Sequence, residues 1–189
     1  MKGGVVIYAA GNDDKDYLSY PSAYPPVISV SAMAPNWEKA WYTNRGDWVD
    51  IMAPGGDEYF TNGMVYSTVP GSLYDGEMYG YMQGTSMACP HVSGIAALIV
   101  SKLGGPGFTN EELKNRLLGS LRPENIDVHN PNYAGRLGIG YIDAARTLAE
   151  NKNQKPENIS DLKADPEYTG MILHWTAVKD EDDGTAIKY

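Results

Sequence analysis

Short apolar runs separated by polar and glycine-rich loops occupy the first half of the chain. Three of them cover residues 5–10, 27–32 and 48–53, and the first is apolar throughout, without polar alternation. Runs of this kind predict short strands that are covered on both faces, as in a parallel sheet. Two further short segments, 64–69 and 77–83, are separated by a glycine-rich turn and have no predicted substrate role.

Longer helical patterns follow these runs. The longest covers about residues 86–103, and its interior is apolar almost all round, so we expect a helix that is buried rather than amphipathic. Pro90 is expected in its first turn, where the missing N–H costs no hydrogen bond. A capping box of Thr109 and Glu112 predicts the start of a second helix, and Asp143 is a suitable N-cap for a third. Strands alternating with helices predict an α/β layer fold.

The composition of the chain changes near residue 150. Residues 1–150 carry the α/β pattern, whereas residues 151–158 are polar, lack apolar periodicity and predict a linker. Residues 159–189 predict the start of an all-β module that the chain cuts off. Its expected strands cover residues 159–164, 171–176 and 186–189.

Composition and charge narrow the range of functions. The 189 residues carry a formal net charge of −9, and the sequence pI is about 4.7. Nucleic-acid binding needs a basic patch, so this balance argues against a nucleic-acid partner. The single cysteine, Cys89, excludes an internal disulfide. No run of about 18 or more apolar residues is present, so the sequence predicts no membrane span.

Ser86 is the main candidate for catalytic chemistry. Gly84 permits a tight turn, and the serine follows it at the predicted N-terminus of a helix, where unpaired N–H groups and the positive end of the helix dipole lie. A developing oxyanion beside Ser86 would be stabilised there. Serine is also an ordinary N-cap, so its position alone does not establish catalysis.

The surrounding string decides between these interpretations. It reads Gly84-Thr85-Ser86-Met87-Ala88-Cys89-Pro90-His91, and it matches every fixed position of the serine motif of the subtilisin family, Gly-Thr-Ser-Met-Ala-x-Pro-His. Further segments resemble the family in the same order, namely residues 6–12, 20–30, 50–55 and 140–145. The chain thus resembles the subtilisin-like serine proteases from Gly3 to about Ala149.

The resemblance implies a fold and a set of roles. The expected fold is part of a three-layer α/β domain with a parallel sheet. Ser86 is expected to attack the scissile carbonyl, while the Asn12 side-chain amide and the Ser86 N–H hold the oxyanion. Ala9, Ala10 and Gly11 are expected to form one wall of the substrate pocket. Without the resemblance, Asn12 is better explained as an asparagine that begins a loop.

The family's triad order, Asp then His then Ser, implies that part of the site lies elsewhere. Both partners of the serine precede the oxyanion asparagine in the family, so we expect them before residue 1 and expect this chain to need the upstream part of its domain. His91 lies five residues after Ser86 on the same helix and is expected to be structural. His129 falls in a polar loop, and His174 falls in the β-module.

Metal and thiol chemistry are secondary hypotheses. Asp13, Asp14 and Asp16 form an acidic loop that either binds calcium, which the resemblance makes possible, or is solvated, which their spacing favours because it is not that of an EF-hand. No cofactor is assigned and no metal-ligating residue is predicted. Cys89 is expected to be buried and inert, and with His91 it offers too few ligands for zinc.

Two functions of different classes remain open. One is a serine endopeptidase acting on proteins or peptides, and the other is an inactive fragment or pseudoenzyme acting as a binding or structural module. An α/β hydrolase is set aside because Met87-Ala88 follows Ser86, where Gly-x-Ser-x-Gly would be needed. The resemblance implies a secreted or cell-envelope location. In residues 159–189, the pattern of Leu162, Trp175 and Tyr189 resembles a fibronectin type III-like module.

Overall fold

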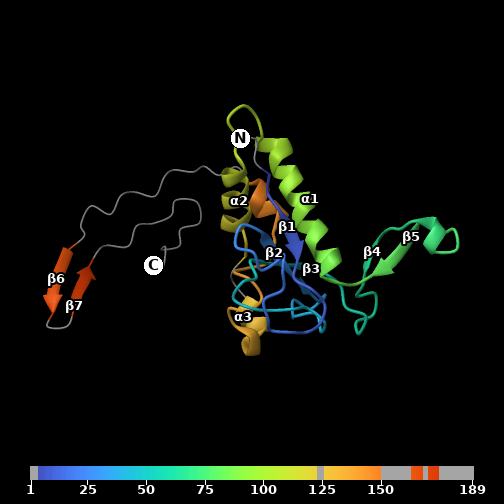
Figure 1. Ribbon diagram of the computed structural model, residues 1–189, viewed down its shortest axis with the longest axis horizontal. Coiled ribbons are helices and arrows are strands. Elements are labelled where there is room, and N and C mark those ends of the chain that lie inside the picture. Colours follow the sequence, from blue (N-terminus) through green and yellow to red (C-terminus); the bar gives the residue numbers. More distant parts are fainter. Residues whose placement is uncertain (1–3, 123–125, 150–162, 168–169, 175–189) are drawn as a thin grey trace. The chain divides into compact units, whose positions relative to one another are not determined.

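The computed structural model describes four ranges of the chain, residues 4–122, 126–149, 163–167 and 170–174 (Figure 1). The chain divides into two compact units, Met1–Leu148 and Ala149–Tyr189, which are considered separately below.

A parallel three-stranded sheet forms the centre of the first unit. Its strands β1 (Ile7–Ala9), β2 (Ile28–Met33) and β3 (Ile51–Pro54) lie in the order β1-β2-β3, and Ile7 pairs with Ile28 (Figure 1). The structure confirms the predicted α/β fold with a parallel sheet. β1 lies at one edge of this sheet, so its outer edge has no strand partner among the described residues.

β3 is shorter than the apolar run from which it was predicted. Residues 48–50 precede it as a turn and loop, and the Val49 N–H donates to the carbonyl of Gly46. The Asp50 carboxylate accepts hydrogen bonds from the backbone and hydroxyl of Ser29, at 2.8 and 3.1 Å. The Asp50 side chain thus takes the place of a regular backbone hydrogen bond between the strands at this position. For this reason β3 begins only at Ile51.

A separate antiparallel hairpin precedes the longest helix. It consists of β4 (Val65–Thr68) and β5 (Tyr79–Met82), with the short 3₁₀ helix η1 (Gly71–Leu73) in the connection between them. The remaining helical elements of the unit are α1 (Thr85–Leu103), α2 (Asn110–Gly119), α3 (Ile126–His129), η2 (Pro131–Tyr133) and α4 (Ala144–Leu148).

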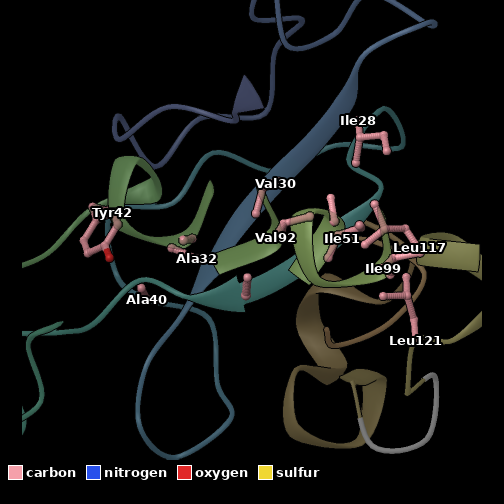
Figure 2. Packing of buried hydrophobic residues seen from close by; sticks show 13 residues of the cluster. Ile28, Val30, Ala32, Ala40, Tyr42, Ile51, Val92, Ile99, Leu117 and Leu121 are labelled. Atoms are coloured by element: carbon pink, nitrogen blue, oxygen red, sulfur yellow. The ribbon is translucent and has the colours of Figure 1, made fainter. Parts of the chain in front are cut away.

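Hydrophobic side chains fill both faces of the sheet. On one face, α1 packs against all three strands and α2 packs against α1. Figure 2 shows Val30, Ile51 and Val92 meeting between helix and sheet. A smaller cluster contains Met52 of β3 together with Ile126, Leu137 and Tyr141. Because Met52 alternates with Ile51 along β3, the two clusters lie on opposite faces of the sheet.

α1 differs from the fully buried helix that its composition predicted. A single stripe is buried, consisting of Thr85, Ala88, Val92, Ala96 and Ile99. Leu98 and Val100 are 49% and 45% exposed. An apolar pattern indicates which residues favour burial, but it does not supply the elements that cover them, and none of the described elements covers this outer side.

α1 also bears on the membrane prediction. By length and composition alone it is apolar enough to cross a bilayer, with a mean hydropathy of 1.3. One such helix is weak evidence for a span, because the core helix of a water-soluble domain passes the same test. Its buried stripe packs on the sheet, as a core helix does.

Pro90 lies further inside α1 than predicted. It is the sixth residue of the helix, in the second turn, so its missing N–H removes the bond that would reach the carbonyl of Ser86. The helix continues without interruption to Leu103.

The capping box at α2 is confirmed. The Glu112 N–H donates to Thr109 Oγ1 at 3.2 Å, and the Thr109 N–H donates to Glu112 Oε2 at 2.7 Å. Asp143 likewise caps α4, because its Oδ1 accepts from the Arg146 N–H at 3.0 Å.

We expect Thr109→Ala to lower the free energy of unfolding by about 1 kcal/mol, because the first turn of α2 loses its side-chain acceptor. Urea unfolding followed by circular dichroism measures this change. Thr61→Ala is the matched control, since Thr61 is an exposed threonine in a turn, and it should change stability by less than about 0.5 kcal/mol. Equal effects of the two substitutions would show that the box does not stabilise α2.

The second unit contains one described hairpin. β6 (Lys163–Glu167) pairs antiparallel with β7 (Gly170–His174), and Lys163 lies opposite His174. Both strands differ by a few residues from the predicted 159–164 and 171–176. The predicted third strand and the whole of the predicted linker lie outside the described residues.

Candidate active site

Ser86 is the second residue of α1, and its side chain is exposed. Its hydroxyl has no hydrogen-bond partner among the residues that the structure describes, so it is free to meet a substrate. The serine lines a cleft of about 400 Å³ between α1 and β1, whose other lining residues are Ile7, Tyr8, Ala9, Cys89, Pro90 and Ser93. The N–H of Ser86 is among the first amides of the helix, which lack intrahelical acceptors.

Hydrogen bonds to Thr85 hold the side chain of Asn12, from the loop after β1, beside the N-terminus of α1. Its Oδ1 accepts from the backbone N–H of Thr85 at 2.9 Å and from the hydroxyl of Thr85 at 2.8 Å. The Thr85 hydroxyl in turn accepts from the Gly11 N–H at 3.1 Å, and Thr85 itself is 1% exposed. With Oδ1 occupied in this way, the amide N–H₂ of Asn12 is left as a free donor on an oriented side chain.

Gly84 has no side chain to fill the space between the two N–H donors, Asn12 Nδ2 and the Ser86 N–H. A methyl group added to Gly84 would lie 3.4 Å from Asn12 Nδ2 and 3.6 Å from the backbone nitrogen of Ser86. Gly84 has φ +145° and ψ 161°, a conformation that residues with a side chain rarely adopt. Two converging N–H donors beside a serine hydroxyl are the arrangement that stabilises an oxyanion in acyl transfer.

The predicted pocket wall occupies the end of β1. Ala9 lines the Ser86 cleft, whereas Ala10 is fully buried and its carbonyl accepts from Asn44 Nδ2 at 3.1 Å. Gly11 has φ +106°, and a side chain there would lie 2.4 Å from the Asn44 amide. Of the three residues, the structure brings only Ala9 to the cleft surface.

Asn44 was not identified from the sequence. It is completely buried, and its Oδ1 accepts from the N–H groups of Asp13 and Lys15 at 3.0 and 3.1 Å. Together with its bond to the carbonyl of Ala10, this fixes the loop on both sides of Asn12. A single buried asparagine carries no periodic pattern, so no sequence signal pointed to it.

Tyr42 is a second positioning residue that the sequence did not reveal. Its hydroxyl accepts from the Gly84 N–H at 2.9 Å and lies within donating distance of the carbonyls of Gly55 and Gly56, at 2.9 and 2.7 Å. Burial raises the pKa of Tyr42 well above its usual value, so the phenol stays protonated and able to donate. It thereby ties the loop after β3 to the turn that presents Ser86.

Neither of the two histidines in the first unit supplies a base at Ser86. His91 Nδ1 donates to the carbonyl of Met87 at 2.8 Å, along its own helix, as predicted for a structural residue. His129 ends α3 and lines a different cleft with Lys39 and Tyr133. His174 ends β7 in the second unit.

Cys89 lies one turn after Ser86. It is half-buried, and its thiol donates to the carbonyl of Ile7 at 3.6 Å. Burial raises the pKa of the Cys89 thiol, which keeps it in the protonated, weakly nucleophilic form. The serine hydroxyl is therefore the better candidate nucleophile in this cleft.

The acidic loop is engaged with protein cations. The Asp14 carboxylate lies 2.7 Å from Lys39 Nζ and 2.5 Å from Arg45 Nη1, and Asp16 pairs with Arg136. Burial raises the pKa of Asp14, but hydrogen bonds and charges from Lys39 and Arg45 outweigh it and hold this pKa below 3.8.

Calcium is not a good fit for this loop. The carboxylates of Asp14 and Asp16 face lysine and arginine side chains. The Asp13 carboxylate accepts hydrogen bonds from the Tyr17 hydroxyl and the Asn44 amide. These partners occupy the oxygens that would otherwise bind a cation. Within the described ranges, no group of three His, Cys, Asp or Glu side chains could hold a metal ion.

Known structures share this fold. One neighbour is a protease from Pseudoalteromonas arctica, with a TM-score of 0.58, 31% identity, and coverage of 76% of this chain and 42% of that one. The epidermin leader peptide processing serine protease of Staphylococcus aureus aligns with a TM-score of 0.63 over 77% of this chain and 40% of that one. At 24% identity, the second likeness concerns the fold alone.

Sequence comparison identifies the family. The sequence profile described as the Subtilase family matches residues 1–161, so the chain belongs to the subtilases. It is 40% identical over 116 residues to the thermophilic serine proteinase of Bacillus sp. (strain AK1), and 40% identical over 119 residues to subtilisin E of Bacillus subtilis (strain 168). Each match covers 61% of this chain but only 25% and 28% of the relatives' own length.

Proposed function

We propose that this chain carries the nucleophile and the oxyanion hole of a serine endopeptidase. Ser86 is the nucleophile, and Asn12 Nδ2 with the Ser86 N–H forms the oxyanion hole. The observation that carries the proposal is the fixed geometry at the start of α1, where Thr85 holds Asn12 Oδ1 and leaves the amide donor beside an unpaired serine hydroxyl. Membership of the subtilases supports the same chemistry.

The proposed reaction is peptide-bond hydrolysis in two steps. A base removes the proton of Ser86 Oγ as the oxygen attacks the scissile carbonyl, and the resulting oxyanion receives hydrogen bonds from Asn12 and the Ser86 N–H. Collapse of this intermediate expels the amine, which takes the proton, and leaves an acyl group on Ser86. Water then attacks the acyl carbonyl and releases the carboxylic acid. The base and its orienting carboxylate belong, in this proposal, to an upstream part of the same domain.

The proposed substrates and cellular location are those that the family implies. We propose proteins and peptides as substrates, with Ala9 contributing to the wall of the cleft that receives them. The antiparallel β6–β7 hairpin is proposed as part of a fibronectin type III-like module that follows the catalytic domain. The family resemblance further supports a secreted or cell-envelope location.

The proposal predicts activity for the complete gene product and little for this chain alone. We expect the gene product to hydrolyse unfolded casein and to be inactivated by a serine-directed fluorophosphonate. The isolated 189-residue chain, assayed in parallel, should be labelled at less than about 1% of that rate, because a serine hydroxyl without a base is a poor nucleophile. Equal labelling of both would refute the claim that the base lies outside this chain.

The same assay addresses the alternative of an inactive binding module. A gene product that is folded, yet neither cleaves casein nor reacts with the fluorophosphonate, would support that alternative and overturn the proposed hydrolysis.

A further inference from the structure

Three tyrosines form a stacked cluster on the β4–β5 hairpin, which we call the tyrosine platform. Tyr66 on β4 lies directly opposite Tyr81 on β5, and their ring centroids are 4.7 Å apart. Tyr79 is two residues before Tyr81 and therefore on the same face, and its ring stacks on that of Tyr66 at 5.7 Å. All three side chains are about half exposed: Tyr66 is 58% exposed, Tyr79 54% and Tyr81 52%.

The hairpin has a second, different face. Val65, Ser67 and Val69 alternate with Tyr66 along the chain. A cleft of about 340 Å³ between the hairpin and α1 is lined by residues of both faces, among them Val65, Tyr66 and Val69, together with Met87 and His91 of α1. Clustered exposed aromatic side chains of this kind are typical of binding surfaces.

The stretch of chain that carries the platform is acidic. Residues 46–101 contain six carboxylates and no lysine or arginine. Asp50 and Asp57 are occupied by hydrogen bonds from the protein, whereas Glu58, Asp75 and Glu77 are exposed. Asp75 and Glu77 lie in the turn at the far end of the hairpin.

The exposed carboxylates lie at both ends of the platform. The Glu77 N–H donates to the carbonyl of Tyr74 in the far turn. At the near end, Glu58 is held beside the last residues of the hairpin, because its N–H donates to Gln83 Oε1 at 2.7 Å. A ligand lying along the tyrosines would therefore meet negative charge at each end.

We propose that the tyrosine platform binds lysine or arginine side chains of an extended, basic polypeptide segment. A cation within about 6 Å of a tyrosine ring is attracted to its face, and nearby carboxylates add to that attraction. This chain already pairs cations with a tyrosine elsewhere, since Arg45 and Lys39 lie 5.1 and 5.4 Å from the ring of Tyr133.

The position of the platform gives this binding a role in substrate selection. β5 ends at Met82, four residues before Ser86, and Tyr66 lines a cleft with Met87 and His91 of α1. A basic segment on the platform would therefore lie near the first turns of the helix that carries the candidate nucleophile. The site would favour polypeptides with a basic stretch next to the cleaved bond. This role rests on the proposed endopeptidase function, whereas binding to the platform does not.

Binding of a fluorescein-labelled penta-arginine peptide to the full 189-residue chain tests the proposal by fluorescence anisotropy in about 20 mM salt, where screening is weak. We expect saturable binding that Tyr66→Leu weakens about 5- to 30-fold, because the central ring is lost. Tyr66→Phe keeps the ring and should bind within about twofold of the wild type. Tyr24→Leu is the control, since Tyr24 is 56% exposed in the loop before β2. It should have no effect.

Several outcomes would overturn the proposal. They are the absence of saturable binding, equal affinity of Tyr66→Leu and the wild type, or an equal loss with Tyr24→Leu. If Tyr66→Leu fails to fold by circular dichroism, the pair Asp75→Asn and Glu77→Gln leaves the rings intact and should still weaken binding several-fold. Because the assay involves no turnover, its failure leaves the endopeptidase proposal standing, and loss of casein hydrolysis leaves the binding proposal standing.

Discussion

Replacement of Ser86 by alanine is expected to lower kcat of the gene product by about 10⁶-fold, which is the loss found for the corresponding serine in subtilisin, a member of this family. The substitution removes the oxygen atom that forms the acyl intermediate. Among the described residues, no other unpaired hydroxyl lies beside Asn12 Nδ2 and the Ser86 N–H. The Ser86 side chain is exposed and makes no hydrogen bond within the described structure. Fold and melting temperature should therefore remain those of the wild type.

Ser93→Ala is the matched control for this prediction. Ser93 lines the same cleft two turns further along α1, but its hydroxyl donates to the carbonyl of Cys89 at 3.2 Å. Casein hydrolysis by this variant should stay within about twofold of the wild type, as expected for a surface substitution. A far smaller loss with Ser86→Ala, or a comparable loss with Ser93→Ala, would contradict the assignment of the nucleophile.

Replacement of Asn12 is expected to have the second-largest effect. Asn12→Ala should lower kcat about 10²–10³-fold with little change in KM, a magnitude carried over from the oxyanion-hole asparagine of subtilisin itself. A donor that meets the oxyanion only in the transition state changes kcat rather than ground-state binding. Steady-state kinetics with a chromogenic peptide separates the two constants.

Asn12→Asp sharpens the test, because aspartate keeps the oxygen that accepts from Thr85 but replaces the amide donor by a second oxygen. Its kcat should fall at least as far as that of Asn12→Ala. Asn132→Ala, at an exposed asparagine in η2, is the control and should be neutral. A rise in KM with unchanged kcat in both Asn12 variants would assign Asn12 to substrate binding instead.

Local signals in the sequence predicted the elements that carry the site. The string from Gly84 to His91 gave the turn, the start of α1 and the position of Ser86, because each depends on residues within a few positions of one another. The capping box at Thr109 and the N-cap at Asp143 were predictable for the same reason, and both form as expected.

Long-range contacts were not predictable from residue patterns, and only the family resemblance indicated that Asn12 lies near Ser86. Tyr42 reaches Gly84 across 42 positions, and Asn12 reaches Thr85 across 73, and no periodic pattern links such pairs. The burial of α1 was overestimated because composition records preference for an apolar environment and not which partner elements are present. The sequence also could not decide whether the acidic loop binds calcium, since the pairing of its carboxylates with Lys39, Arg45 and Arg136 depends on the fold.

Identification of the residue that reacts with a fluorophosphonate tests the central claim most directly. The gene product is treated with the probe until casein hydrolysis stops, digested, and mapped by peptide mass spectrometry. We predict one adduct per molecule, on the peptide that contains Ser86, and none on the Ser86→Ala variant. An adduct on another residue, or full inactivation without modification of Ser86, would contradict the claim that Ser86 at the start of α1 is the nucleophile.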